Sequence, residues 1–271
     1  FRNSPLVSKK IIKLLYKAGL PKEWCTHLIC DNDTTADLAK SNLINYISFI
    51  GSSKVGWSIK QKMAPGVRIV LEHGGTAPVI VAVDADLKKA VPQIANSGFY
   101  HAGQVCISAQ KIYVHKTIID SFVSQLNLQA QLKKIGNPLS EKTFIGPIIS
   151  ESSLNRIDNW VQEAINEGAT LICGGNKLQN NCYEPTVLLN PSQNSLVSKE
   201  EIFGPVICIY SFNENEEAIQ LANNSPYIFQ SAAYTNTLNQ AFNFANKLSG
   251  ASVIINNHPA FRVDWMPFGG Q

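Results

Sequence analysis

Short apolar runs of strand type alternate with amphipathic helical runs along most of the chain, and this alternation limits the folds available to it. The runs VRIVLEH (67–73) and PVIVA (78–82) precede helical spacing over 87–99, and KIYVH (111–115) precedes helical spacing over 118–129. Such alternation predicts a parallel-rich sheet with crossover helices, which is an α/β fold. The other predicted strands are 25–30, 45–50, 169–175, 184–189, 205–212 and 252–257, and the other predicted helices are 7–18, 34–41, 53–62, 154–168, 216–224 and 238–248.

Composition and charge are those of an ordinary globular protein. The 271 residues are 45% hydrophobic and 16% charged, and 23 Lys and Arg against 20 Asp and Glu give a net charge of +3. So small a bias predicts neither a nucleic-acid partner nor a membrane surface. No apolar run approaches the roughly 18 residues that suggest a membrane span, and the N-terminal stretch lacks the pattern of a signal peptide, so we expect a cytoplasmic location.

The six cysteines are scattered and predict neither a disulfide framework nor a metal site. Cys25 and Cys30 flank His27 in CTHLIC, which we interpret as a strand. A zinc site usually needs a second ligand pair at a suitable spacing.

A glycine-rich turn in FIGSSKVG (49–56) separates a predicted strand from a predicted helix. Such a turn leaves backbone N–H groups free at a helix N-terminus, where the helix dipole favours a phosphate group. Gly51 gives the turn its freedom and Ser52 adds a hydroxyl donor. By itself the motif is weak, and a plain strand–turn–helix connection is the simpler interpretation.

An acidic residue, Glu72, ends an otherwise apolar strand in LEHGGTAPVIV (71–81). Gly74 and Gly75 follow it and allow another chain or a ligand to approach closely. A carboxylate held at a desolvated strand end can serve as a general base. Taken alone, a glutamate in a surface turn is the simpler interpretation.

A cysteine, Cys106, stands among small and polar residues in HAGQVCISAQ (101–110), where backbone approach rather than packing is favoured. A cysteine nucleophile needs access, a route to the thiolate and donors for the oxyanion that it creates. The backbone N–H of Cys106 could supply one such donor. Most cysteines in a cytoplasmic enzyme are packing residues, so this motif is ambiguous by itself.

The three motifs, followed in order by EEIFGPV (200–206), NNSPY (223–227) and PFGG (267–270), resemble the aldehyde dehydrogenase superfamily. The resemblance runs through essentially the whole chain. It implies the second part of a Rossmann-type cofactor domain over residues 1–73, followed over residues 74–271 by the α/β catalytic domain that carries the thiol nucleophile. Complete members have a longer N-terminal portion and a tail after PFGG, so both ends of this chain look cut from a larger protein.

The resemblance also implies roles for individual residues. Cys106 matches the nucleophile that forms a thiohemiacetal and then a thioester, and Glu72 matches the base that activates water to hydrolyse it. Hydride passes to NAD or NADP, and no metal is implied. The residues that match cofactor contacts are Gly51, Ser52, Gly74, Glu201 and Phe203.

A finer resemblance lies in FRVDWMPFGG (261–270), which is similar to the branch that contains lactaldehyde and phosphonoacetaldehyde dehydrogenases. Arg262 could pair with an anionic group of the substrate, because a guanidinium forks onto carboxylate or phosphate. A structural pair with Asp264 is the alternative. His258 is a weaker candidate for substrate contact, the alternative being a structural loop residue.

The sequence departs from the family pattern at His73, where leucine is usual, and at Ile228 and Phe229, where small residues are usual. Two other functions stay open. One is a catalytically silent binding or structural piece of such an enzyme; the other is the subclass that passes the thioester to coenzyme A. Members of that subclass typically lack the glutamate, so Glu72 favours hydrolysis. The parent protein is expected to be a homo-oligomer that acts on a small aldehyde.

Overall fold

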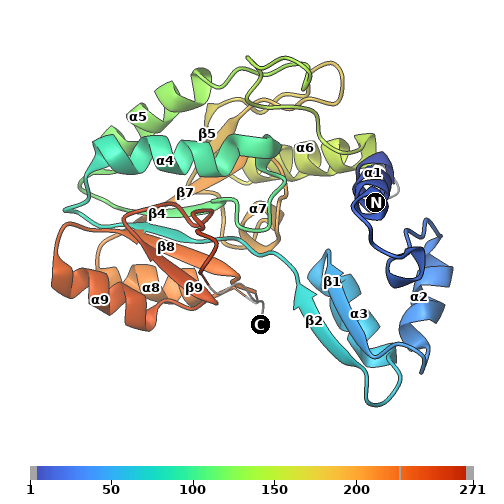
Figure 1. Cartoon of the computed structure of the whole chain (residues 1–271). Coiled ribbons are helices and arrows are strands. Elements are labelled where there is room, and N and C mark those ends of the chain that lie inside the picture. The colour runs from blue at the N-terminus through green and yellow to red at the C-terminus, as the bar shows by residue number, and fades with distance from the viewer. Residues whose placement is uncertain (1–4, 226, 267–271) are drawn as a thin grey trace. The chain divides into compact units, whose positions relative to one another are not determined.

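The computed structural model describes residues 5–225 and 227–266 (Figure 1). The chain divides into two compact units, one made of Phe1–Phe49 and Lys54–Ile69 and the other of Ile50–Ser53 and Val70–Gln271. We describe each unit by itself.

Helices make up most of the first unit. They are α1 (Pro5–Lys17), the 3₁₀ turn η1 (Lys22–Trp24), α2 (Asn32–Lys40) and α3 (Ser53–Lys62), and β1 (Tyr46–Ile50) and β2 (Arg68–Glu72) form a two-stranded sheet. The helix α2 begins where the side chain of Asp31 accepts a hydrogen bond from the N–H of Thr34 at 2.8 Å. The predicted helices 7–18, 34–41 and 53–62 are therefore confirmed, with shifts of one to two residues at their ends.

The prediction of a strand at CTHLIC (25–30) is wrong. The backbone is extended at Cys25, but residues 25–30 join no ladder with any described residue. A strand is defined by its pairing, and apolar alternation alone does not supply a partner.

Parallel pairing dominates the second unit. Among the described residues, seven strands form one sheet in the order β5-β6-β7-β4-β3-β8-β9, and all pairs are parallel except β5 with β6. The parallel-rich sheet and its crossover helices are thus confirmed. The strands are β3 (Val79–Val81), β4 (Lys111–His115), β5 (Thr170–Cys173), β6 (Thr186–Leu189), β7 (Val206–Phe212), β8 (Gln230–Tyr234) and β9 (Ser252–Ile255).

Helices cover both faces of this sheet, with α4 and α5 on one side and α8 and α9 on the other (Figure 1). The central strands β3 and β4 are accordingly buried on both faces, as is usual for parallel sheets. Large side chains such as Tyr113, Phe122 and Phe212 fill the core. The helices are α4 (Leu87–Phe99), α5 (Ile119–Gln131), α6 (Glu151–Asn166), α7 (Leu196–Lys199), α8 (Asn215–Asn223) and α9 (Leu238–Lys247).

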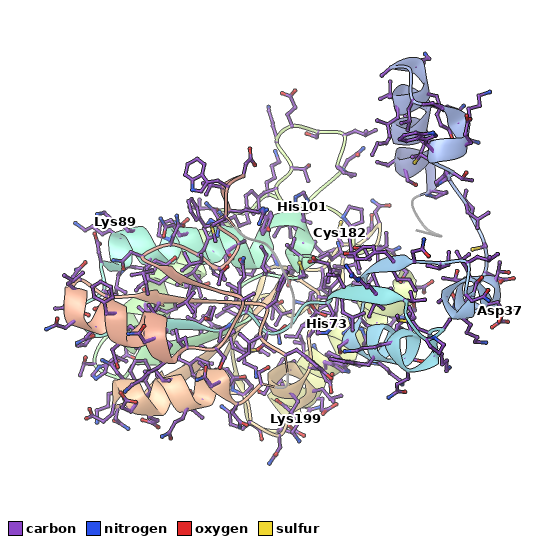
Figure 2. All side chains as sticks on the ribbon, turned by 60° about the horizontal axis from the view of Figure 1, so that its bottom comes forward. Asp37, His73, Lys89, His101, Cys182 and Lys199 are labelled. Carbon is purple, nitrogen blue, oxygen red and sulfur yellow. The ribbon has the colours of Figure 1, made fainter. Side chains whose placement is uncertain are left out.

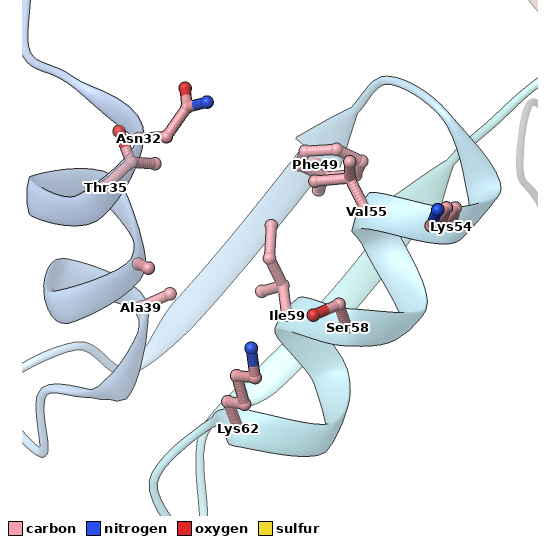
Figure 3. A pocket seen from close by; sticks show the side chains of 10 residues that line it. Asn32, Thr35, Ala39, Phe49, Lys54, Val55, Ser58, Ile59 and Lys62 are labelled. Carbon is pink, nitrogen blue, oxygen red and sulfur yellow. The ribbon is translucent and has the colours of Figure 1, made fainter.

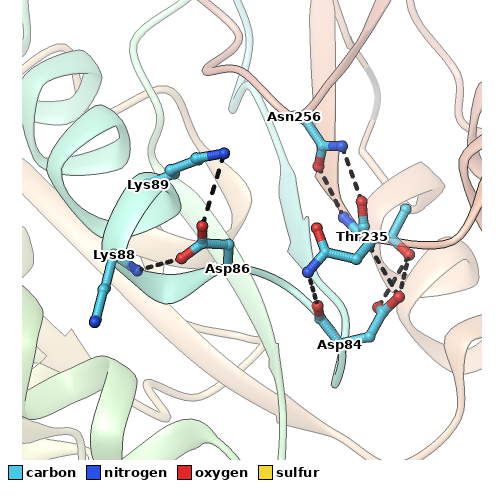
Figure 4. A network of polar contacts seen from close by, with 7 residues as sticks. Asp84, Asp86, Lys88, Lys89, Thr235 and Asn256 are labelled. Atoms are coloured by element: carbon cyan, nitrogen blue, oxygen red, sulfur yellow. Dashed lines mark hydrogen bonds and ion pairs between the residues drawn. The ribbon is translucent and has the colours of Figure 1, made fainter.

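Two aspartates between β3 and α4 have different roles. Asp86 is the cap, and it accepts a hydrogen bond from the N–H of Lys88 at 3.0 Å. Asp84 instead accepts hydrogen bonds from the Thr235 hydroxyl and the Asn236 N–H, each at 2.9 Å (Figure 4). Asp84 therefore ties the end of β3 to the end of β8.

In the described part of the chain, no helix is both long and apolar enough to cross a membrane.

Candidate active site

The loop that carries Cys106 begins with a sharp break in the helix that precedes it. After α4, residues His101 (φ 50°), Ala102 (φ 57°) and Gly103 (φ 67°) all adopt the left-handed conformation in η2 (Tyr100–Gly103), and Figure 2 shows His101 at this end of α4. A Cβ on Gly103 would overlap the Gly204 carbonyl oxygen and lie 2.9 Å from the Pro205 nitrogen. Only glycine lets the cysteine loop pass this close to the loop that follows Glu201.

The amide of Gln104 fixes the position of the same loop. Its Nε2 donates to the carbonyl oxygens of His101 and Pro147, each at 3.2 Å, and its Oε1 accepts from the Ile149 N–H at 2.9 Å. Cys106, two residues further on, is half-buried and reduced. The nucleophile predicted from the sequence is therefore accessible and sits on an anchored loop.

Two carboxylates lie close enough to the Cys106 thiol to influence its ionisation. Burial raises the pKa of Cys106 most, the negative charge of Glu201 raises it further, and that of Glu72 adds to this; its own backbone N–H acts in the opposite direction. A Cβ on Gly74 would overlap Glu201 Oε1 and lie 3.0 Å from the Cys106 Cα. The structure therefore brings together four of the candidate site residues, Cys106, Glu72, Gly74 and Glu201.

One oxygen of each carboxylate is buried without a hydrogen-bond partner among the described residues, namely Oε2 of Glu72 and Oε1 of Glu201. Leaving a buried acceptor unpaired is unfavourable by about 1–3 kcal/mol, and by more for a charged group. Burial raises the pKa of Glu201 to about 7, although the Arg156 guanidinium opposes the shift. Such orphaned oxygens suit a ligand that brings hydroxyl groups or a water molecule to be activated.

The loop with Glu201 and Phe203 is held by residues that the motifs did not reveal. Arg156 of α6 donates from Nη2 to the Ile202 carbonyl at 2.8 Å and stacks on the Trp160 ring. Gln110, at the end of the cysteine loop, makes three further hydrogen bonds to this segment. Arg156 belongs to no motif, and Gln110 is the last residue of HAGQVCISAQ but has no role assigned from the sequence; the three-dimensional contacts identify both.

A hollow of about 720 Å³ lies beside the nucleophile loop. Tyr100, His101 and Gln104 line it from the loop side, and Phe144 and Phe203 line it from other segments. Phe203 has φ 51°, which is an unfavourable backbone conformation for a large side chain. It also has 38% of its surface exposed. The hollow is large enough for a small organic molecule and combines aromatic walls with a few polar groups.

The phosphate-binding turn predicted at Gly51 and Ser52 is exposed and leads directly into α3. Within the first unit, a separate hollow of about 380 Å³ lies between α2 and α3 (Figure 3). Phe49, Val55 and Ile59 give it apolar walls. A helix N-terminus for phosphate and an apolar slot for a flat ring are two features that a dinucleotide requires.

The two candidate substrate residues lie after β9. His258 is half-buried, its Nδ1 has no hydrogen-bond partner among the described residues, and burial lowers its pKa. Arg262 is exposed. Their roles stay predictions, and the PFGG motif (267–270) lies outside the described residues.

The departures from the family pattern are accommodated by packing. His73 is buried and meets the Tyr227 ring edge-on at 4.9 Å between centroids. Ile228 and Phe229 are also buried, so larger side chains fill this part of the core.

Comparison with known proteins agrees with this geometry. The model of the aldehyde dehydrogenase family matches residues 2–271, and the chain belongs to this family. A lactaldehyde dehydrogenase of Methanococcus maripaludis is 41% identical over 265 residues, which are 97% of this chain and 56% of that protein. The chain thus spans about half the length of the curated relatives that it matches.

Solved structures show the same fold. A glyceraldehyde-3-phosphate dehydrogenase of Methanocaldococcus jannaschii, complexed with NADP, superposes with a TM-score of 0.94 at 39% identity over 99% of this chain and 59% of that one. A betaine aldehyde dehydrogenase of Staphylococcus aureus, in complex with NAD⁺, gives 0.92 at 33% identity over 98% and 54%. Relatives of this chain therefore bind NAD⁺ or NADP, and the α/β fold is that of aldehyde dehydrogenases.

Proposed function

We propose that the protein to which this chain belongs oxidises an aldehyde to the carboxylic acid with NAD⁺ or NADP⁺, using Cys106 as nucleophile and Glu72 as general base. The observation that carries the proposal is the meeting of one accessible thiol with two carboxylates, each of which has one buried oxygen without a hydrogen-bond partner among the described residues. Structural ion pairs do not leave acceptors orphaned in this way, whereas a site that receives a ligand does.

The residues present fit a nicotinamide dinucleotide. The N–H groups at the start of α3, with Gly51 and Ser52, suit the pyrophosphate, and the orphaned Oε1 of Glu201 suits the hydroxyls of a ribose. Gly74 leaves the space that a side chain would fill beside Glu201 and Cys106. When bound, the nicotinamide accepts the hydride that leaves the substrate carbon.

Cys106 performs the first step, attack of its thiolate on the aldehyde carbon. Burial and Glu201 hold the pKa of Cys106 above its ordinary value, so the thiol first gives its proton to a nearby carboxylate, which releases it to solvent before the second step. The Cys106 backbone N–H can donate to the oxygen that becomes negative in the adduct. Loss of hydride from this adduct leaves a thioester on the sulfur.

Glu72 performs the second step, removal of a proton from water. The resulting hydroxide attacks the thioester carbon, the carbon–sulfur bond breaks, and the acid and the Cys106 thiolate are released. The orphaned Oε2 of Glu72 is the acceptor that this step requires. A base at this place favours water over coenzyme A as the second nucleophile, which makes the acylating subclass the weaker candidate.

The substrate that we propose is a short polar aldehyde. The motif FRVDWMPFGG (261–270) supports this class, and so do the relatives named for lactaldehyde and glyceraldehyde 3-phosphate. Arg262, and less directly His258, would bind the polar or anionic end of such a substrate.

The experiment that tests the proposal combines cofactor titration with an activity assay. Calorimetric titration of the chain with NAD⁺ and NADP⁺ is followed by measurement of aldehyde-dependent cofactor reduction, with Cys106→Ser as the test variant and Cys182→Ser as its control. We expect binding and turnover that Cys106→Ser abolishes and Cys182→Ser retains. Binding without turnover in the wild-type chain and in both variants would support the silent binding piece instead, and turnover retained by Cys106→Ser would refute the mechanism.

A further inference from the structure

The side chain of Gln110 is buried and every polar part of it is used on a single segment. Its Nε2 donates to the carbonyl oxygens of Val197 at 3.1 Å and Glu200 at 2.8 Å, and its Oε1 accepts from the Ile202 N–H at 2.9 Å. The bonds to Glu200 and Ile202 bracket Glu201 on both sides. One amide therefore fixes the backbone from which the Glu201 carboxylate projects.

The backbone of Gln110 is fixed as well as its side chain. It immediately precedes β4 and stands four residues after Cys106 in the chain. Between them, Ser108 Oγ donates to the Ser97 carbonyl at 3.0 Å and the Ala109 N–H donates to Ser97 Oγ at 3.3 Å. These bonds anchor the segment to α4, so Gln110 connects two rigidly held parts of the second unit.

We propose that Gln110 is a positioning residue, which holds the Glu201 carboxylate against Gly74 and beside the Cys106 thiol. This inference rests on the proposed function, because it assigns Gln110 a part in preparing the cofactor and nucleophile sites. Gln110 carries no charge and touches neither reacting group, so it acts only through the geometry of Glu201. Arg156 supports the same loop, but its charge also acts on the Glu201 carboxylate, so an Arg156 variant would change the position and the ionisation of Glu201 together.

Only an amide satisfies this place. Methionine has a similar length but would remove the three hydrogen bonds that the amide makes to the Val197 and Glu200 carbonyls and the Ile202 N–H, and the loop would move to hydrate these groups. Asparagine keeps the amide but is one methylene too short to reach all three partners.

The test is the pH profile of Cys106 alkylation by iodoacetamide without cofactor, followed by peptide mass spectrometry. The charged groups that raise the pKa of the Cys106 thiol are Glu201 and Glu72, and the thiol in turn raises the pKa of Tyr100. Gln110→Met is expected to let the Glu201 charge move away, so the midpoint moves to lower pH and alkylation below that midpoint becomes roughly threefold faster or more. Changed access alters the plateau rate instead, so the midpoint separates charge from access.

Three variants complete the design. Glu201→Gln is expected to move the midpoint in the same direction, and adding Gln110→Met to it should move the midpoint no further, because the charge is already gone. Gln162→Met is the matched control. Gln162 lies on α6 and its Nε2 donates to the Gly175 carbonyl at 3.0 Å, so its loss should leave the midpoint of Cys106 alkylation unchanged. If Gln110→Met does not fold, Gln110→Asn is measured in the same way with the same expectation.

An unchanged or higher midpoint in Gln110→Met, or a further shift in the double variant, would overturn the positioning role. Protection of Cys106 by NAD⁺ or NADP⁺ is measured on the same wild-type samples. If neither cofactor protects Cys106, the proposed function is refuted, and with it the part of Gln110 in that function, even where the midpoint shifts. Protection together with the expected shift supports both.

Discussion

Two neighbouring glycines, Gly74 and Gly75, predict opposite results for the same one-methyl change. A Cβ on Gly74 would overlap Oε1 of Glu201 and lie 2.9 Å from its Cδ, and both atoms belong to the end of a flexible side chain. A Cβ on Gly75 would overlap the carbonyl oxygen of Tyr227 and lie 3.0 Å from its carbonyl carbon, and both are backbone atoms. A side-chain end rotates away easily, whereas backbone does not.

Gly75→Ala should therefore be mainly a stability variant. Overpacking against backbone destabilises by about 1–3 kcal/mol, which lowers the melting temperature by roughly 2–4 °C for each kcal/mol in a chain of this size. Gly74→Ala should change stability by less than about 1 kcal/mol, because the reduced freedom of the unfolded chain offsets the small shift required at the Cys106 Cα, 3.0 Å away.

The functional effects should be reversed. In Gly74→Ala the Glu201 carboxylate is displaced, and losing hydrogen bonds to a charged group weakens cofactor binding roughly tenfold to a hundredfold. The assay pairs thermal unfolding with calorimetric titration of the cofactor. In a Glu201→Ala background, Gly74→Ala should weaken binding no further, since no carboxylate remains to be displaced. A further loss in that background, or a larger fall in melting temperature for Gly74→Ala than for Gly75→Ala, would refute the reasoning.

Three other predictions concern the same site. Because the pKa of Glu201 is raised to about 7, cofactor affinity should fall as the pH drops through 7 and the carboxylate gains a proton; Glu201→Gln should remove this dependence in titrations across that range. The same raised pKa gives Glu201 a contribution to stability that is fully present below about pH 4.5 and lost as the pH rises to about 7, which denaturant midpoints of wild type and Glu201→Gln would detect. Glu72→Gln should slow thioester hydrolysis by roughly a hundredfold or more while leaving the initial burst of reduced cofactor, and an unchanged steady-state rate would contradict its role as base.

Most of the sheet could be predicted because its strands carry their own local signal. Val79, Ile80 and Val81, and likewise the strand 111–115, are apolar runs bounded by turn residues. The strand β8 was missed because QSAAY has no β-branched residue and only one aromatic one. Its small side chains suit a place between β3 and β9, and only tertiary packing creates that place.

The site divides in the same way. Cys106, Glu72 and Glu201 could be identified as candidates because their motifs, taken together, resemble those of the aldehyde dehydrogenase family. Gln110 and Arg156 could not, because their importance depends on which backbone atoms lie opposite them. An ordinary glutamine near the start of a strand has no sequence signature for the loop that it holds.

The two carboxylates near Cys106 have a consequence for oxidation of the thiol in the resting protein. Peroxide and other oxidants attack the thiolate, and each step from sulfenic to sulfinic acid begins with that ion. Burial and the charges of Glu201 and Glu72 favour the protonated form of the Cys106 thiol. We therefore expect peroxide to oxidise Cys106 more slowly in the resting protein than it oxidises an exposed cysteine of ordinary pKa.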